Sequence, residues 1–186
     1  PQTRAGRPPT DTVGYTDVKI FDSMGPRHSN GSRQYFNGSR CAAGMRVSDD
    51  DGLERILDHD TIAVVGCSTT PGKAAHDIPA YLQRHGYRIV PVNPFADEVL
   101  EETAYDSLAE VPDSIDIDVV DVFRPSEEAG GIVDAAIERA DRVGDVSAVW
   151  LQLDITDSEA GERAADAGVD FVQDRCLKVE HRRLRG

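Results

Sequence analysis

The chain has 186 residues, which suffices for one well-packed α/β domain and is too short for two of ordinary size. Its 34 Asp and Glu residues outnumber 20 Lys and Arg, and the resulting net charge of −14 opposes binding to nucleic acid or to an anionic membrane. This acidic balance is typical of proteins from a high-salt cytoplasm, where screening weakens self-repulsion. No segment approaches the roughly 20 apolar residues that span a bilayer, and no signal-peptide pattern is present. We therefore expect a cytoplasmic protein without a membrane partner.

Residues 1–44 differ in composition from the rest of the chain. They hold six Lys and Arg and three Asp and Glu, are rich in Gly, Pro, Ser and Asn, and show neither helical nor strand periodicity. We predict that this segment is a disordered leader, a mis-assigned start or a non-native extension, with Met45 as a natural start. Residues 45–186 are predicted to form the domain, with its core from 61 to 175.

From residue 49 onward, short helical patterns alternate with apolar, β-branched runs. The predicted helices cover residues 49–58, 74–84, 126–142 and 158–167, and the predicted strands cover residues 61–66, 87–92, 117–123, 148–152 and 169–172. Residues 93–116 are predicted to be irregular. Strands that alternate with helices favour right-handed crossovers, a parallel sheet, and ligands bound outside the carboxyl ends of the strands. The predicted fold is therefore a single Rossmann-like, doubly wound α/β domain, whose mostly parallel five-stranded sheet has helices on both faces.

The segment between the first strand and the second helix has the features of an anion-binding loop. It begins with Gly66 and ends with Gly72-Lys73, so that backbone N–H groups and the helix dipole can meet a phosphate. Ser68 and Thr69 add hydroxyl donors. The alternative is an ordinary strand-to-helix turn in which Gly66 makes the bend and the hydroxyls cap the helix.

This loop departs from two common nucleotide-binding motifs. Ser68 replaces the second glycine of the dinucleotide fingerprint, while Gly66 and Gly72 lie one residue too far apart for a P-loop. A dinucleotide-binding domain also has an acid near the end of its second strand, where this chain has Asn93-Pro94. NAD(P) is therefore the less favoured cofactor.

In combination, several short segments resemble the small CoA-binding Rossmann-fold protein family, which is similar to the CoA-binding domain of the succinyl-CoA synthetase α subunit. The resemblance covers residues 61–184. It rests on residues 63–68 with Pro71 and Lys73, and on residues 81–82, 86–87, 91–94, 105–108, 122–124, 149–152 and 174–176. One departure is Leu100-Glu101-Glu102, where many relatives carry a glycine.

The resemblance implies a set of cofactor-binding residues. Gly66, Ser68 and Lys73 would lie at the CoA phosphates, in a loop that also contains Cys67, Thr69 and Pro71. Asn93 and Pro94 would border the adenosine and pyrophosphate, and Phe123 and Arg124 would line the same crevice. Trp150 and Gln152 would lie beside the pantetheine arm or the wall behind it.

Three of these residues have plainer alternatives. Trp150 fits core packing equally well. Arg124 can pair with Glu127 or Glu128 in place of a phosphate. Cys67 lies near a helix N-terminus, which favours a thiolate that could form a mixed disulfide with CoA, but a small residue filling a tight turn is the favoured interpretation.

No pattern in the sequence indicates catalysis or a metal. The histidines lack metal-ligand spacing, and Cys41, Cys67 and Cys176 form neither a disulfide framework nor a zinc motif. The predicted function is to hold CoA or acyl-CoA without evident catalysis. An NAD(P)-binding redox or sensor module and a scaffold with a vestigial site are the alternatives, and a homodimer or an unidentified protein partner stays open.

Overall fold

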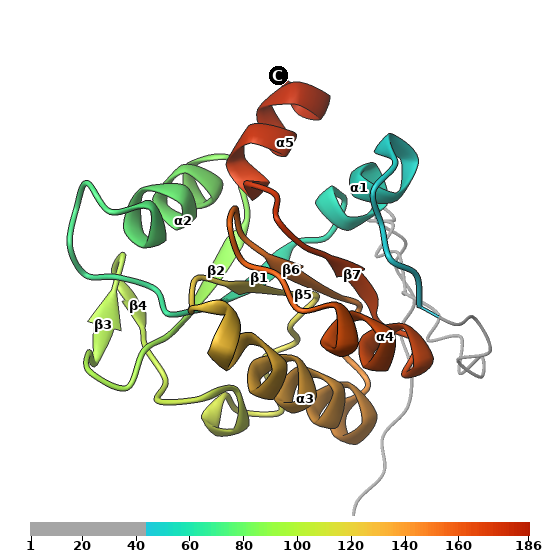
Figure 1. The fold of residues 1–186 in the computed structure, drawn as a ribbon. Helices are drawn as coiled ribbons and strands as arrows, with labels where there is room; N and C mark the ends of the chain where they lie inside the picture. The colour runs from blue at the N-terminus through green and yellow to red at the C-terminus, as the bar shows by residue number, and fades with distance from the viewer. Residues whose placement is uncertain (1–43) are drawn as a thin grey trace, which may run out of the picture. The chain divides into compact units, whose positions relative to one another are not determined.

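The computed structural model describes residues 44–186, which form a parallel five-stranded sheet with helices on both faces (Figure 1). In spatial order the strands are β2 (Arg88–Val92), β1 (Thr61–Val65), β5 (Val119–Val122), β6 (Ala148–Leu151) and β7 (Asp170–Val172). These strands are almost entirely buried, as expected for a parallel sheet covered on both sides. The predicted Rossmann-like α/β fold is confirmed.

The two faces of the sheet are covered by different helices (Figure 1). One face packs against α1 (Asp50–Leu57), α2 (Ala74–Arg84) and α5 (Leu177–Arg185), and the other packs against α3 (Ser126–Val143) and α4 (Ser158–Asp166). Successive strand residues serve opposite faces: in β1, Ile62 and Val64 belong to the first cluster and Ala63 to the second. The continuous apolar runs of the sequence therefore supply both cores.

The strand order creates one crossover point beside β1. The chain leaves β1 to form β2 on one side and later returns to form β5 on the other, where Ile62 pairs with Val119. The chain that follows β1 and the chain that follows β5 therefore lead away from each other at the carboxyl ends of these two strands. A crevice opens between the two connections.

The segment between β2 and β5 is more ordered than predicted. It contains the two-stranded hairpin of β3 (Glu98–Val99) and β4 (Glu102–Thr103) and the 3₁₀ turn η1 (Leu108–Glu110). Leu100 and Glu101 form the hairpin turn with φ values of 58° and 65°, a conformation that glycine adopts at lower cost. The prediction of an irregular stretch was wrong here, because the turn lacks the Gly or Asn that normally indicates such a hairpin.

Buried Arg139 of α3 fixes the chain that follows this hairpin. Its guanidinium pairs with Asp145 at 2.9 Å and donates to the carbonyl oxygens of Val111 and Ile115, both at 2.8 Å. The side chain is 1% exposed. Arg139 therefore takes the role of a backbone partner for residues 108–115 and holds this segment beside α3.

Two further elements lie outside the predicted set. Residues 45–47 pair with β7, where the Val47 amide donates to the Phe171 carbonyl at 2.8 Å, and α5 packs its buried Leu177 and His181 against the core. The prediction of disorder for residues 1–44 falls outside the described residues, except for Gly44. None of the helices within residues 44–186 is long and apolar enough to cross a bilayer.

Candidate functional site

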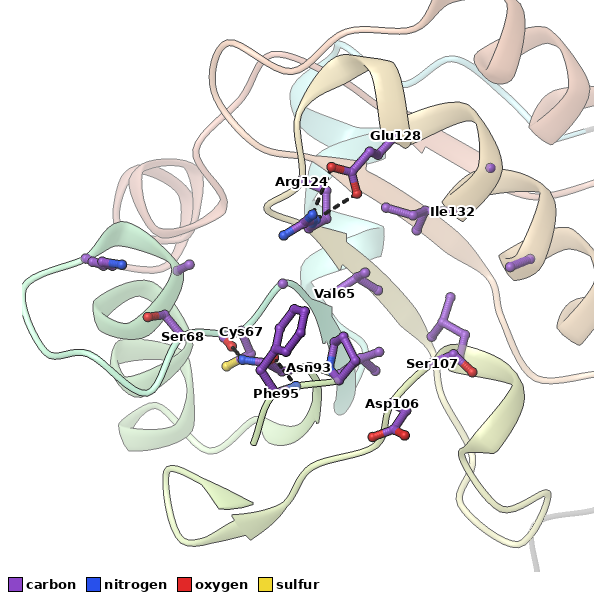
Figure 2. Close-up of a pocket in the computed structure, with 18 residues that line it drawn as sticks. Val65, Cys67, Ser68, Asn93, Phe95, Asp106, Ser107, Arg124, Glu128 and Ile132 are labelled. Carbon is purple, nitrogen blue, oxygen red and sulfur yellow. Dashed lines mark hydrogen bonds and ion pairs between the residues drawn. The ribbon is translucent and has the colours of Figure 1, made fainter. Parts of the chain in front are cut away.

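A cavity of about 480 Å³ lies at the carboxyl ends of β1, β2 and β5, at the crossover point of the sheet (Figure 2). The β1–α2 loop, the chain after β2 and the first turns of α3 form its walls. The residues that line it are Val65, Gly66, Cys67, Ser68, Lys73, Ala75, Val92, Asn93, Pro94, Phe95, Asp106, Ser107, Leu108, Arg124, Glu128, Gly131, Ile132 and Ala135.

Gly66 makes the turn from β1 into the loop. Its φ is 87°, and a Cβ at this position would lie 2.9 Å from Cδ of Arg124 and 3.3 Å from the Phe123 carbonyl oxygen. Gly66 is thus needed both for its backbone conformation and for the close approach of the Arg124 stem. That approach directs the guanidinium toward the cavity.

Most of the polar backbone of the loop is already paired within the protein. The amide of Ser68 donates to the Ala75 carbonyl at 2.9 Å, that of Thr70 to Oγ of Ser68 at 3.1 Å, and that of Gly72 to the Asp77 carboxylate at 3.0 Å. Hydrogen bonds from His76 and then from the Gly72 amide hold the pKa of Asp77 below its usual value. These amides are therefore not free to donate to an anion in the cavity, which would interact mainly with side chains.

Two cations reach the cavity from different elements. Lys73 is the N-cap residue of α2 and is exposed, and no ion pair of residues 44–186 includes it. Arg124 follows β5 and donates from Nε and Nη2 to Glu128, at 2.9 and 2.8 Å. The ion pair considered as an alternative for Arg124 is thus present, with Glu128 as its partner.

Asn93 ties the ends of two strands together at the cavity. Its Nδ2 donates to the Cys67 carbonyl at 2.8 Å, and its Oδ1 accepts from the Phe95 amide at 2.9 Å. These bonds hold the chain after β2 against the β1–α2 loop, with Pro94 also in the wall. Phe95 itself is 90% exposed at the rim of the cavity.

The other predicted site residues lie away from the cavity. Thr69 and Pro71 are exposed on the loop, and Phe123 packs against the core on the side of α2. Trp150 is fully buried and donates from Nε1 to the Arg175 carbonyl at 2.7 Å. Core packing therefore describes Trp150 in this structure.

Gln152 is also buried and faces an acid. Its Nε2 donates to both carboxylate oxygens of Asp121, at 2.9 and 3.1 Å, and Asp121 is entirely shielded from solvent. Burial raises the pKa of Asp121 to about 7, although hydrogen bonds from Gln152 and the Val122 amide oppose the shift. Burial, with the Asp121 charge as a smaller cause, raises the pKa of the Cys67 thiol to about 12. A thiolate at Cys67 is thus disfavoured, and a small residue filling the turn fits the geometry.

Several cavity residues were missed at the level of sequence. Glu128, Ile132 and Ala135 lie at helical spacing along one face of α3, and Asp106 and Leu108 come from the chain after β4. The spacing on α3 was a usable signal. Asp106 and Leu108 belong to the segment 105–108 that supported the family resemblance, but their place beside the cavity depends on tertiary contacts.

Comparison with known proteins assigns the domain to a family. The family model described as a CoA binding domain matches residues 60–182. The chain belongs to this CoA-binding domain family. A protein of Bacillus subtilis named YneT is 38% identical over 120 residues, which cover 64% of this chain and 84% of that protein. A solved protein of Pyrococcus horikoshii OT3 superposes with a TM-score of 0.69 at 33% identity, covering 77% of this chain and 96% of that one.

A larger relative matches this chain over a small part of its own length. The ADP-forming acetate–CoA ligase II of Archaeoglobus fulgidus is 39% identical over 64 residues, which are 33% of this chain and 10% of the ligase. Within residues 44–186, no group of three or more His, Cys, Asp and Glu side chains is placed to hold a metal ion. Membership of the CoA-binding domain family suggests that the ligand of this chain is a small molecule, CoA.

Proposed function

We propose that the protein holds CoA or an acyl-CoA in the cavity at the ends of β1, β2 and β5 and does not itself transform it. The observation that carries the proposal is the presence of two cations, Lys73 and Arg124, which reach the cavity of a CoA-binding domain from two different elements. Cations from two elements suit a ligand whose phosphates are separated, as in CoA with its diphosphate and 3′-phosphate.

The uncharged part of the cavity suits the nucleoside. Leu108, Gly131, Ile132 and Ala135 give a wall of small and apolar groups, and a planar base can pack against such a surface. The exposed ring of Phe95 at the rim offers a stacking partner. We propose that the adenine lies in this part, with the pantetheine arm leading outward.

The chemistry of the site supports holding the ligand without converting it. Group transfer from a CoA ligand typically uses a nucleophile or an acid–base pair within reach of the reacting atoms. Cys67 keeps its proton because its pKa is raised to about 12, and the buried carboxylate of Asp121 is bound by Gln152. In the ligase of A. fulgidus the matching segment is 10% of the chain, so the remaining parts of such an enzyme would have to come from elsewhere.

Calorimetric titration of the protein with CoA, dephospho-CoA and NADH in molar KCl tests the proposal. CoA should bind most tightly, and Lys73→Ala should weaken CoA binding by about tenfold, the effect of one charge-assisted hydrogen bond. Ser68→Ala should weaken it less. Arg88→Ala is the matched control, since it removes one exposed positive charge from the opposite end of β2, away from the cavity. Absence of CoA binding to the folded protein would refute the proposal.

One observation keeps NAD(P) as a second candidate. Asp106 lines the cavity, and a carboxylate there can accept hydrogen bonds from ribose hydroxyls, although it lies in the chain well after β2. If NAD(P)H is the ligand, it should outcompete CoA in the titration, and Asp106→Asn should weaken NADH binding selectively. A scaffold with a vestigial site would instead show a melting temperature indifferent to every cofactor.

A further inference from the structure

At the mouth of the cavity, Arg124 is already occupied by a carboxylate of the protein itself. Glu128 reaches back from the first turn of α3 and accepts two hydrogen bonds from the guanidinium, at 2.9 and 2.8 Å (Figure 2). Both side chains are about half exposed, at 44% and 48%. The pair is therefore accessible to a competing ligand.

The fold holds this pair in place from both sides. The stem of Arg124 packs over Gly66, which has room for it only because it lacks a Cβ. Glu128 is in the first turn of α3, where the helix dipole favours a negative charge, and it is four residues from Arg124. Each partner is thus held near its position independently of the other.

The charges around the cavity cancel in this arrangement. Among the described residues that line it, Lys73 and Arg124 are balanced by Asp106 and Glu128. A phosphate offers the guanidinium the same two-pronged geometry as a carboxylate. Glu128 takes the Nε and Nη2 donors of Arg124, so a phosphorylated ligand that binds this two-pronged edge of the guanidinium has to replace Glu128 there.

We propose that Glu128 is a resident counter-ion of Arg124 that a ligand phosphate displaces from the Nε–Nη2 edge of the guanidinium, and that Glu128 thereby lowers the affinity of the cavity for CoA. This inference rests on the proposed function, because it assumes that CoA binds in this cavity. Glu128 acts as a competitor: its removal frees Arg124 for the ligand, whereas removal of an orienting residue would weaken binding.

The test compares Glu128→Gln with Glu127→Gln in calorimetric titrations with CoA. Glu127 is the exposed neighbour of Glu128 in the same helical turn and does not line the cavity, so both variants lose the same charge from α3. Glu128→Gln should bind CoA about fivefold more tightly than the wild type, the upper range for an exposed ion pair, and Glu127→Gln should stay within about twofold. Equal affinities for the two variants, or weaker binding by Glu128→Gln, would overturn the inference.

A second pair of variants separates competition for Arg124 from simple repulsion of the ligand. In an Arg124→Ala background, Glu128→Gln should improve binding no more than Glu127→Gln does. A gain that persists without the guanidinium would show repulsion and contradict the counter-ion role. If wild-type protein binds no CoA, the proposed function and this inference fall together; if it binds CoA through Lys73 but the two Glu variants do not differ, only this inference falls.

Discussion

Gln152 binds the buried carboxylate of Asp121 through a single amide nitrogen, which donates to both oxygens at 2.9 and 3.1 Å. Asp121 lies in β5 beside Trp150 of the neighbouring strand β6, and Gln152 directly follows β6. A carboxylate in such a place has lost its water and gained only a few hydrogen bonds. Its protonation should therefore be linked to folding.

Asp121→Asn should change how stability depends on pH. The pKa of Asp121 is raised from 3.8 to about 7 by burial, so the folded chain holds a proton that the unfolded chain has released. The proton on Asp121 stabilises the folded state. This contribution to the free energy of unfolding is complete below about pH 4 and is lost as the pH rises through about 7. The variant should be more stable than the wild type at pH 8, on the order of a few kcal/mol from about 1.4 kcal/mol per pKa unit, and show little difference at pH 4.

Urea unfolding from pH 4 to pH 8 measures this dependence. Asp116→Asn serves as a control, because Asp116 is an exposed acid in the chain before β5. Parallel pH profiles for Asp121→Asn and the wild type would show that the buried acid does not titrate in this range.

Arg139→Leu should destabilise the domain strongly. The substitution leaves the carboxylate of Asp145, 4% exposed, without its partner and releases the carbonyls of Val111 and Ile115. Loss of one member of a buried ion pair costs about 3–5 kcal/mol. Arg142→Leu, which removes an exposed pair with Asp113, should cost less than about 1 kcal/mol in the same chemical denaturation experiment. Similar losses for both variants would contradict the role given to Arg139.

Gly66→Ala and Gly72→Ala should separate backbone strain from crowding. Both glycines have a positive φ, 87° and 90°, so each substitution should cost about 1–2 kcal/mol of stability. A Cβ at Gly72 meets nothing within 4 Å, whereas at Gly66 it would push against Cδ of Arg124. Only Gly66→Ala should also weaken CoA binding, by several-fold, in titrations below the melting temperature. An equal loss of affinity in both variants would mean that strain, not the position of Arg124, is responsible.

Cys67 should resist alkylation in the folded protein. Burial raises the pKa of its thiol to about 12, and the side chain has no solvent exposure. Iodoacetamide at pH 8 should modify Cys67 at least about 100-fold more slowly in the native than in the unfolded chain. Peptide mass spectrometry resolves it from Cys176, which is half-buried and should react sooner. Rapid native labelling of Cys67 would reopen a mixed disulfide with CoA.

The sheet could be predicted from the sequence because its strands are buried on both faces. Continuous apolar, β-branched runs such as residues 61–66 and 117–123 are compatible with few structures other than a buried strand. Helix α5 was missed because most of its residues are charged, and its docking depends on Leu177 and His181 meeting α1 and α2. The β3–β4 hairpin was missed because Leu100 and Glu101 adopt left-handed conformations that residues of their type seldom take.

The candidate site was predicted in part: Asn93, Pro94 and Arg124, which the family resemblance indicated, line the cavity together with the residues of the β1–α2 loop. Gly66, Ser68 and Lys73 follow one another along a strand–loop–helix unit, so their proximity needs no tertiary information. The wall formed by Ile132 and Leu108 depends on how α3 packs against η1, which spacing does not reveal. The binding role of every predicted residue stays a prediction that the titrations above would test.

The outer strands of the sheet both have neighbours along their free edges. The amide of Phe171 in β7 donates to the Met45 carbonyl at 2.9 Å, and Tyr105 bonds to both Pro91 and Asn93 at the outer side of β2. Pro91 has no amide hydrogen to offer an incoming strand. An open edge is what lets sheets join from one molecule to the next. A strand of another molecule could therefore pair at these positions only by displacing residues 45–47 from β7 or Tyr105 from β2.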